Sequence, residues 1–187
     1  LFRSIFAFSQ ENWQRPQEEV DSLMVLLQQY VATQSAELTS QGVRVRMLGD
    51  LERLSSQARD AVDYVESVTA GGGTLALNIC ISYGGRAELT RVARQLAGEV
   101  SAGRMRPDEV TEARIAERLY TAPWGDPDLL IRTSGEFRLS NFLLWQLAYA
   151  ELHLTDVLWP DFDARALEGA LRDFQGRNRR FGGRSEE

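Results

Sequence analysis

Short apolar runs of strand length alternate along this chain with longer stretches whose apolar residues recur at helical spacing. The run at residues 75–82 follows a glycine triplet and is almost continuously apolar, which is typical of a central strand covered on both faces. Apolar runs at residues 1–9 and 129–133 predict two further strands, and Val43, Val45 and Met47, which alternate with Arg44 and Arg46, predict a half-buried third. Because strands that alternate with helices pair in parallel, the pattern predicts an α/β fold with a mostly parallel central β-sheet flanked by helices.

The stretches between the predicted strands have the spacing of amphipathic helices. Pro16, Glu18 and Glu19 suit a first helical turn, and Gly42 can end the same helix. A chain of 187 residues is long enough for one full core and short for two, so we expect a single domain over residues 1–187. Further helices are expected at residues 58–68, 89–100, 112–120, 141–150 and 167–180.

Composition excludes several classes of function. The formal net charge is −6, which does not favour nucleic acid as a partner. One cysteine and one histidine cannot supply a zinc cluster or a disulfide. No apolar stretch reaches the length of a membrane-spanning helix and no signal-peptide pattern opens the chain, which predicts a cytoplasmic location. All 21 basic residues are arginine, which fits either phosphate binding or a genome rich in G and C.

Two arginines follow the predicted strand at residues 129–133. Ligands of open parallel sheets bind beyond the carboxyl ends of the strands, so Arg132 and Arg138 stand where a ligand is expected. Together with the Ser140 hydroxyl and the N–H groups at the start of the next predicted helix, they could hold a diphosphate. An ion pair between one of these arginines and Glu136 explains the same residues equally well.

Polar residues also follow other predicted strands. Ser9 and Asn12 could orient a substrate, although both residue types cap helices and capping is slightly favoured. Gly84 and Gly85 allow the backbone to approach a ligand, or simply form a turn. Glu151 could bind Mg²⁺ beside a substrate phosphate, or could be a buried carboxylate paired with an arginine. Together these segments indicate an anionic, phosphate-bearing ligand.

The same segments resemble the cis-prenyltransferase family, whose bacterial members include undecaprenyl diphosphate synthase. The resemblance extends from Ile5 to Gly183, in that family's order. Its most specific parts are Ala-Phe-Ser-x-Glu-Asn-Trp-x-Arg-Pro at residues 7–16 and the run from Ile131 to Leu152. Matches of this length are far more specific than a short motif.

The resemblance implies roles for the polar residues at the strand ends. Arg132, Arg138 and Ser140 would hold the diphosphate of isopentenyl diphosphate, and Glu151 would help to place Mg²⁺. The resemblance also implies residues near the allylic substrate. Ser9 and Asn12 would be catalytic and lie beside the reacting carbons. Phe8 and Trp13 would bind substrate, and Arg15 would lie near the allylic diphosphate.

A hydrophobic tunnel that receives the growing prenyl tail is a further implication of the resemblance. Ala7, Val43 and Leu75 would line part of it. Ordinary core packing explains Val43 and Leu75 equally well.

One part of the family's pattern is missing from this chain. The family's first strand and helix carry His-x-x-Asp-Gly-Asn-x-Arg-Trp, and the Asp of this motif binds Mg²⁺. This chain contains neither the motif nor its Asp. Because the chain opens inside an apolar run without Met, we expect a piece of a longer protein that is inactive by itself. An upstream segment with Asp-Gly-Asn is therefore predicted.

The protein expected from the resemblance is a magnesium-dependent cis-prenyl diphosphate synthase that condenses isopentenyl diphosphate with an allylic diphosphate such as farnesyl diphosphate. It is expected to be a homodimer whose poly-cis-prenyl product, used for lipid carriers, brings it transiently to the membrane surface. One alternative is a non-catalytic partner subunit of the same fold. Another is a phosphate-binding module without transferase activity. Retention of Asn12, Arg132 and Glu151 favours the enzyme.

Overall fold

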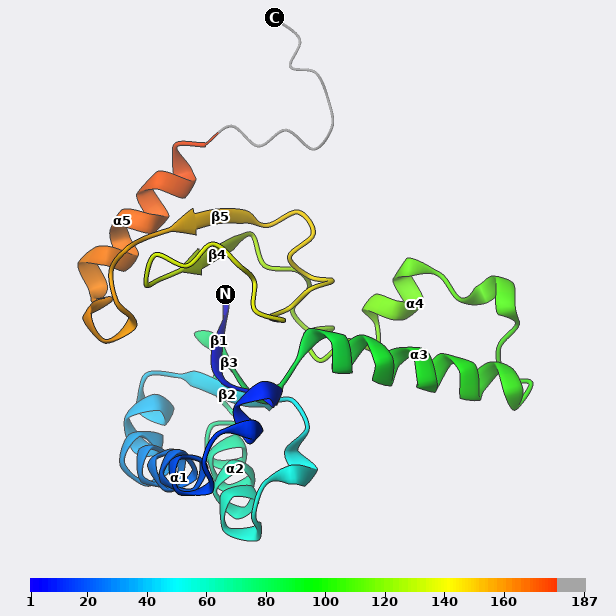
Figure 1. Cartoon of the computed structure of the whole chain (residues 1–187), viewed down its shortest axis with the longest axis horizontal. Coiled ribbons are helices and arrows are strands. Elements are labelled where there is room, and N and C mark those ends of the chain that lie inside the picture. Colours follow the sequence, from blue (N-terminus) through cyan, green and yellow to red (C-terminus); the bar gives the residue numbers. More distant parts are fainter. Residues whose placement is uncertain (178–187) are drawn as a thin grey trace, which may run out of the picture. The chain divides into compact units, whose positions relative to one another are not determined.

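The computed structural model describes residues 1–177. Its internal contacts divide the chain into two compact units, Leu1–Trp124 and the part that begins at Gly125, and each unit is described by itself (Figure 1). Both contain parallel strands and helices, so the predicted α/β class is confirmed. The single domain over residues 1–187 stays a prediction.

The first unit is built on a three-stranded parallel sheet. Its strands β1 (Phe2–Ser9), β2 (Val43–Leu48) and β3 (Leu75–Tyr83) lie in the order β1-β3-β2, so the last strand in sequence is the central one. The predicted central position of residues 75–82 is therefore confirmed. Parallel neighbours need long crossover connections, and two helices supply them.

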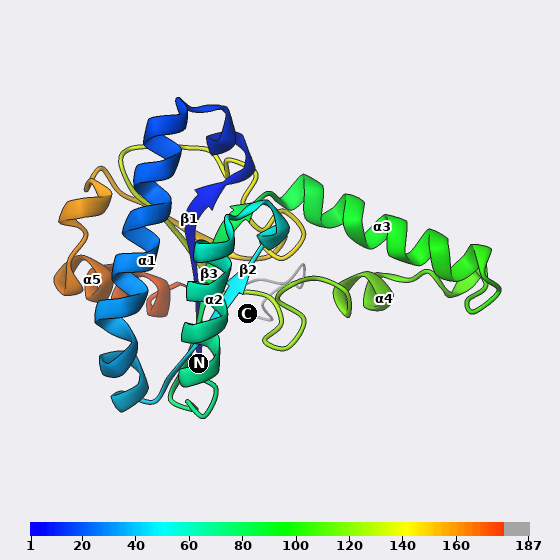
Figure 2. The same cartoon turned by 90° about the horizontal axis from the view of Figure 1, so that it is seen from below.

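These crossover helices cover one face of the sheet. Helix α1 (Gln17–Ser40) connects β1 to β2, and α2 (Ser56–Val68) connects β2 to β3. Two perpendicular views place both helices on the same side of the strands (Figure 1, Figure 2). The core lies between the sheet and the two helices, and its most buried members are Phe8, Val20, Val45, Leu54, Ala58, Val62, Val65 and Ile81.

After β3 the chain forms an arm of two antiparallel legs. Helix α3 (Gly85–Ser101) leads away from the sheet, and the returning leg carries the short helix α4 (Glu112–Ala116), as Figure 2 shows. The helix predicted at residues 112–120 is thus shorter than expected. None of the described helices is long and apolar enough to cross a membrane.

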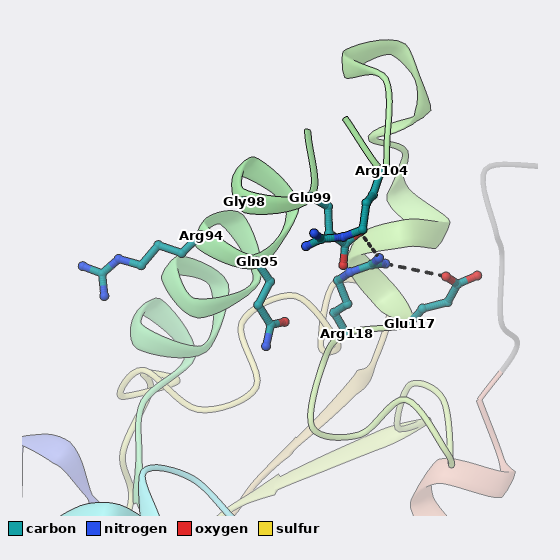
Figure 3. Close-up of a pocket in the computed structure, with 7 residues that line it drawn as sticks. All are labelled: Arg94, Gln95, Gly98, Glu99, Arg104, Glu117 and Arg118. Carbon is teal, nitrogen blue, oxygen red and sulfur yellow. Dashed lines mark hydrogen bonds and ion pairs between the residues drawn. The ribbon is translucent and has the colours of Figure 1, made fainter. Parts of the chain in front are cut away.

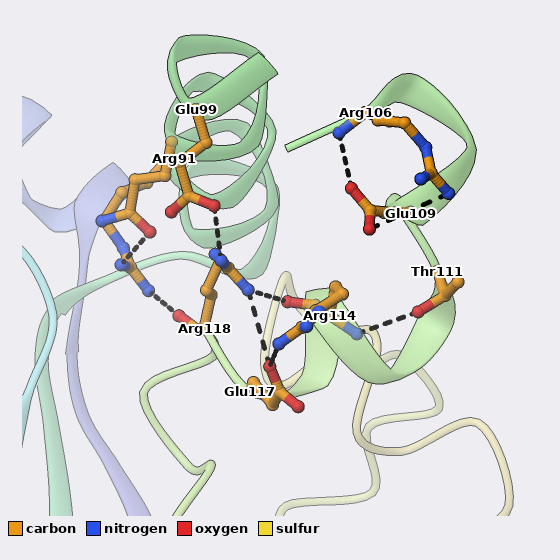
Figure 4. Close-up of polar contacts among 9 residues, drawn as sticks. Arg91, Glu99, Arg106, Glu109, Thr111, Arg114, Glu117 and Arg118 are labelled. Atoms are coloured by element: carbon orange, nitrogen blue, oxygen red, sulfur yellow. Dashed lines mark hydrogen bonds and ion pairs between the residues drawn. The ribbon is translucent and has the colours of Figure 1, made fainter. Parts of the chain in front are cut away.

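Arginine side chains join the two legs of the arm (Figure 4). Arg91 donates to the carbonyl of Arg118 at 2.7 Å, and the Arg118 guanidinium donates to the Glu99 carboxylate at 2.6 Å. Arg118 also lies 3.7 Å from the Glu117 carboxylate, beside an open pocket of about 660 Å³ that Arg94 and Arg104 help to line (Figure 3). The positive charge of Arg118 is therefore balanced within the arm.

A buried carboxylate holds the base of the arm. Glu88 is 2% exposed and accepts hydrogen bonds from the Tyr83 hydroxyl and the Tyr120 N–H, both at 2.6 Å. Burial raises the pKa of the Tyr120 hydroxyl, and a guanidinium, that of Arg91, lies 4.1 Å from the centroid of its ring. These contacts fix the start of α3 to the end of the returning leg.

The second unit contains a two-stranded parallel sheet and one helix. Strand β4 (Leu129–Arg132) pairs with β5 (Glu151–Leu154), and α5 (Ala164–Gln175) packs against β5. Strand β5 was not predicted. Helix α5 ends before the predicted Arg180, which lies outside the described residues together with the rest of 178–187.

The helix predicted at residues 141–150 is wrong. This segment consists of turns and bends. Ser140, Asn141 and Leu143 have φ of 49°, 64° and 40°, in the left-handed region that an α-helix of L-residues cannot contain. Its apolar spacing reflects burial instead, since Phe142, Leu143 and Leu147 are buried.

Candidate functional site

The carboxyl end of β1 forms a short 3-10 helix, η1 (Gln10–Gln14), which carries the first group of candidate residues. The Ser9 hydroxyl accepts from the Asn12 N–H at 3.3 Å, and the Asn12 side-chain oxygen accepts from the Ser9 N–H at 2.8 Å. This reciprocal pair is a capping box, so the capping explanation of both residues is correct. Their expected catalytic roles stay predictions.

Trp13 joins the ends of β1 and β3. Its indole N–H donates to the hydroxyl of the fully buried Ser82 at 2.9 Å. Its ring packs edge-to-face on Phe8, with ring centroids 5.1 Å apart. The predicted substrate-binding residues Phe8 and Trp13 therefore lie together. Gly84 alone separates β3 from α3 and is the N-cap of that helix.

An arginine that the sequence analysis did not select also contacts Trp13. The Arg53 guanidinium carbon lies 4.9 Å from the centroid of the Trp13 ring. Arg53 belongs to η2 (Leu51–Arg53), which follows the end of β2. The rule that selected Arg132, a charged residue just beyond a strand end, applies to Arg53 as well and could have found it.

Arg15 points along the first turn of α1. Its guanidinium is 2.7 Å from the Glu19 carboxylate, and both side chains are about half exposed. An exposed ion pair of this kind contributes little to stability and opens easily. Arg15 is therefore available to exchange Glu19 for another anion.

The three residues expected to line a tunnel have different surroundings. Val43 is buried in the core and pairs with Leu75 across the sheet, and Leu75 packs against the same core. Ala7 is exposed and lies in a register shift of β1, where Phe6 and Phe8 are paired but Ala7 is not. The core explanation of Val43 and Leu75 thus agrees with the structure, and the tunnel stays a prediction.

The second unit holds the other arginines. Arg132 ends β4 and is partly buried, and its Nε is buried with no hydrogen-bond partner in the described part of the chain. Arg138 is 65% exposed and forms an ion pair with Glu136. The ion-pair alternative is therefore correct for Arg138, whereas residues 1–177 contain no carboxylate paired with Arg132. Ser140, also exposed, occupies the left-handed turn that follows.

Glu151 begins β5 and is paired with an arginine, as the alternative to Mg²⁺ binding predicted. Its carboxylate lies 3.0 Å from the Arg177 guanidinium, and both side chains are about 30% exposed. Arg177 also binds the Asp173 carboxylate, at 2.6 Å. Hydrogen bonds from His153 and then Arg177 lower the pKa of Asp173 below its ordinary value. The described residues contain no group of three His, Cys, Asp or Glu side chains that could hold a metal ion.

Comparisons with known proteins identify the family of this chain. The family model described as "Putative undecaprenyl diphosphate synthase" matches residues 2–182. An isoprenyl transferase from Prochlorococcus marinus is 48% identical over 96% of this chain and 68% of its own length. A (2E,6E)-farnesyl-diphosphate-specific ditrans,polycis-undecaprenyl-diphosphate synthase from Xanthomonas campestris is 50% identical over 96% of this chain and 69% of its own length.

Among solved structures, the lavandulyl diphosphate synthase of Lavandula x intermedia in complex with dimethylallyl diphosphate has a TM-score of 0.94 to this chain. It is 36% identical, and the match covers 97% of this chain and 79% of the plant enzyme. The family match spans both units and every candidate residue discussed above. The chain therefore belongs to the undecaprenyl diphosphate synthase family of prenyltransferases.

Proposed function

We propose that this protein elongates prenyl chains with cis geometry by condensing isopentenyl diphosphate with an allylic diphosphate such as farnesyl diphosphate. The allylic C–O bond breaks and inorganic diphosphate leaves. A C–C bond forms between the allylic carbon and the terminal carbon of the isopentenyl double bond, and one proton is lost. The observation that best supports this proposal beyond family membership is Arg132, a partly buried cation at a strand end whose Nε has no partner in the described residues.

The arginines divide between the two diphosphates in this proposal. Arg132 donates to the diphosphate of isopentenyl diphosphate, and Arg138 joins it by exchanging the exposed Glu136 ion pair for phosphate oxygens. The Ser140 hydroxyl is a further donor. Arg15 binds the allylic diphosphate after the corresponding exchange with Glu19. These groups act by binding and positioning anionic substrates and by stabilising the charge of the leaving diphosphate.

The residues of η1 lie on the allylic side of the reaction. Ser9 and Asn12 hold each other in the capping box, which fixes their polar atoms beside the end of β1. Phe8 and Trp13 form an aromatic pair against which an apolar substrate can pack. Ala7, Val43 and Leu75 line the path of the growing tail. We propose a cytoplasmic homodimer that meets the membrane surface through its apolar product.

Mg²⁺ is part of the proposal, and one described carboxylate, that of Glu151, is proposed as its protein ligand. Glu151 supplies a single carboxylate, which suffices where substrate phosphates supply the other oxygen ligands. Bound Mg²⁺ would neutralise negative charge on the leaving diphosphate. To hold Mg²⁺, the Glu151 carboxylate would have to give up its ion pair with Arg177.

Chain elongation by the full-length protein tests the proposal directly. Incubation with labelled isopentenyl diphosphate, farnesyl diphosphate and Mg²⁺ is expected to give labelled polyprenyl diphosphates, detected by chromatography. Labelled products that appear only after a second, homologous subunit is added would favour the non-catalytic partner subunit. Binding of diphosphate without any elongation would leave only the phosphate-binding module.

Glu151→Gln is expected to raise the Mg²⁺ concentration required for half-maximal activity by about 10-fold, because the variant removes a metal-ligand charge. The matched control is Arg177→Gln, which breaks the same 3.0 Å ion pair but keeps the carboxylate. The control is expected to leave the Mg²⁺ requirement unchanged or to lower it. Parallel changes in both variants would mean that the ion pair, and not metal binding, is the role of Glu151.

A further inference from the structure

Arg53 lies in a segment that is fixed to the carboxyl ends of the first unit's strands. The Asp50 N–H donates to the carbonyl of Ser82 at 3.1 Å, which ties the chain after β2 to the end of β3. The turn η2 follows at once and ends with Arg53. Its side chain is exposed and reaches Trp13, which follows the end of β1. Three strand ends thus meet around one guanidinium and one indole ring.

The charge of Arg53 is not balanced by any carboxylate within ion-pair distance in residues 1–177. Arg15, two residues after Trp13 in the sequence, is by contrast paired with Glu19 at 2.7 Å. Asp50 and Glu52 lie within three residues of Arg53 in the sequence, yet neither forms an ion pair with it in the described residues. Arg53 is therefore a source of uncompensated positive charge beside η1.

The contact with Trp13 holds the Arg53 side chain without using its hydrogen-bond donors. A guanidinium stacked over an aromatic ring is attracted to the negative face of that ring. The N–H groups around the edge of the guanidinium plane stay free to donate. Trp13 is itself held by the Ser82 hydroxyl and by Phe8. A stacked, pre-oriented guanidinium is well suited to bind phosphate oxygens in pairs.

We propose that Arg53 is a further substrate-binding residue that donates to the diphosphate of the allylic substrate, with Trp13 as the platform that orients it. The inference rests on the proposed function and adds a residue to the allylic side. The allylic diphosphate is favoured over isopentenyl diphosphate because Trp13 belongs to η1, together with Asn12, and Arg15 follows directly. Arg53 and Arg15 then approach the same diphosphate from two different strand ends.

Steady-state kinetics of Arg53→Gln in the full-length protein test the inference. The KM for farnesyl diphosphate is expected to rise about 10-fold, because a charge-assisted pair of hydrogen bonds is lost, while the KM for isopentenyl diphosphate changes less than about 2-fold. The matched control is Arg59→Gln, which removes an equal charge from an exposed position on α2. Arg53→Lys keeps the charge without the planar fork and is expected to fall between the two.

Inhibition by inorganic diphosphate separates binding from a merely structural role. Its inhibition constant against farnesyl diphosphate is expected to rise in Arg53→Gln in parallel with KM. A fall in kcat or in thermal stability, with KM and the inhibition constant unchanged, would overturn the inference, and so would a rise in the KM for isopentenyl diphosphate alone. If the unsubstituted protein elongates nothing, the proposed function fails instead. Calorimetric titration of Arg53→Gln and of its control Arg59→Gln with inorganic diphosphate then tests Arg53 separately.

Discussion

Arg132→Gln is expected to lower kcat/KM for isopentenyl diphosphate by about 100- to 1,000-fold, the loss usual when one pre-positioned charged donor is removed from an active site. The partly buried guanidinium ends β4, and its Nε has no partner in the described residues, so phosphate oxygens are the natural acceptors. Glutamine keeps polar atoms near the same place without the charge. Initial rates at varied isopentenyl diphosphate, with farnesyl diphosphate saturating, measure the effect.

Two further arginines serve as comparisons for this experiment. Arg138→Gln is expected to cost about 10-fold, because Arg138 is 65% exposed and is already paired with Glu136. Arg172→Gln removes an exposed arginine that is paired with Glu168 on α5, and is expected to leave the kinetics unchanged. Equal, small effects in all three variants would contradict the assignment of Arg132 to the diphosphate.

Gly49→Ala is expected to destabilise the protein by about 2–5 kcal/mol, the sum of backbone strain and overpacking. Gly49 has φ of 144°, and a Cβ at this position would lie 1.9 Å from the carbonyl oxygen of Ile81. That oxygen belongs to the central strand, so it cannot move aside as a flexible side chain can. Urea denaturation followed by circular dichroism measures the change in the free energy of unfolding.

Gly98→Ala is the matched control for this substitution. Gly98 lies within α3, and an added Cβ there would meet nothing within 4 Å. Alanine is expected to stabilise the helix by about 0.5–1 kcal/mol, because glycine loses more backbone entropy on folding. A loss of stability in Gly98→Ala as large as that in Gly49→Ala would mean that close approach at Ile81 is not the cause.

The strands and helices that were predicted correctly are those in which one face of a regular element is buried, because such burial leaves a regular pattern of apolar residues in the sequence. In β2, Val43, Val45 and Met47 are buried while Arg44 and Arg46 are exposed, so a period of two was visible in the sequence. The segment at residues 141–150 failed for a physical reason, since its apolar spacing fits a helix but its backbone takes left-handed turns. Periodicity reports which side chains are buried and carries no information about the sign of φ.

The candidate site shows the same limit. A strand-end rule selected Arg132 from the sequence, and the structure adds that its Nε lacks a partner in the described residues. The sequence left open whether Ser9 and Asn12 cap a helix, and only coordinates show the reciprocal hydrogen bonds. The same strand-end rule applies to Arg53, but only the structure shows that its guanidinium lies over the ring of Trp13, 40 positions earlier in the chain.

The strand order of the first unit bears on how the protein folds as it is synthesised. β1 and β2 do not pair with each other, and both wait for β3, which follows them in the chain. Until β3 has left the ribosome, neither strand can form the pairings of this three-stranded sheet, and closing such long loops slows folding. This topology thus delays assembly of the sheet until translation has passed Tyr83, and strand edges that stay unpaired in that interval favour aggregation.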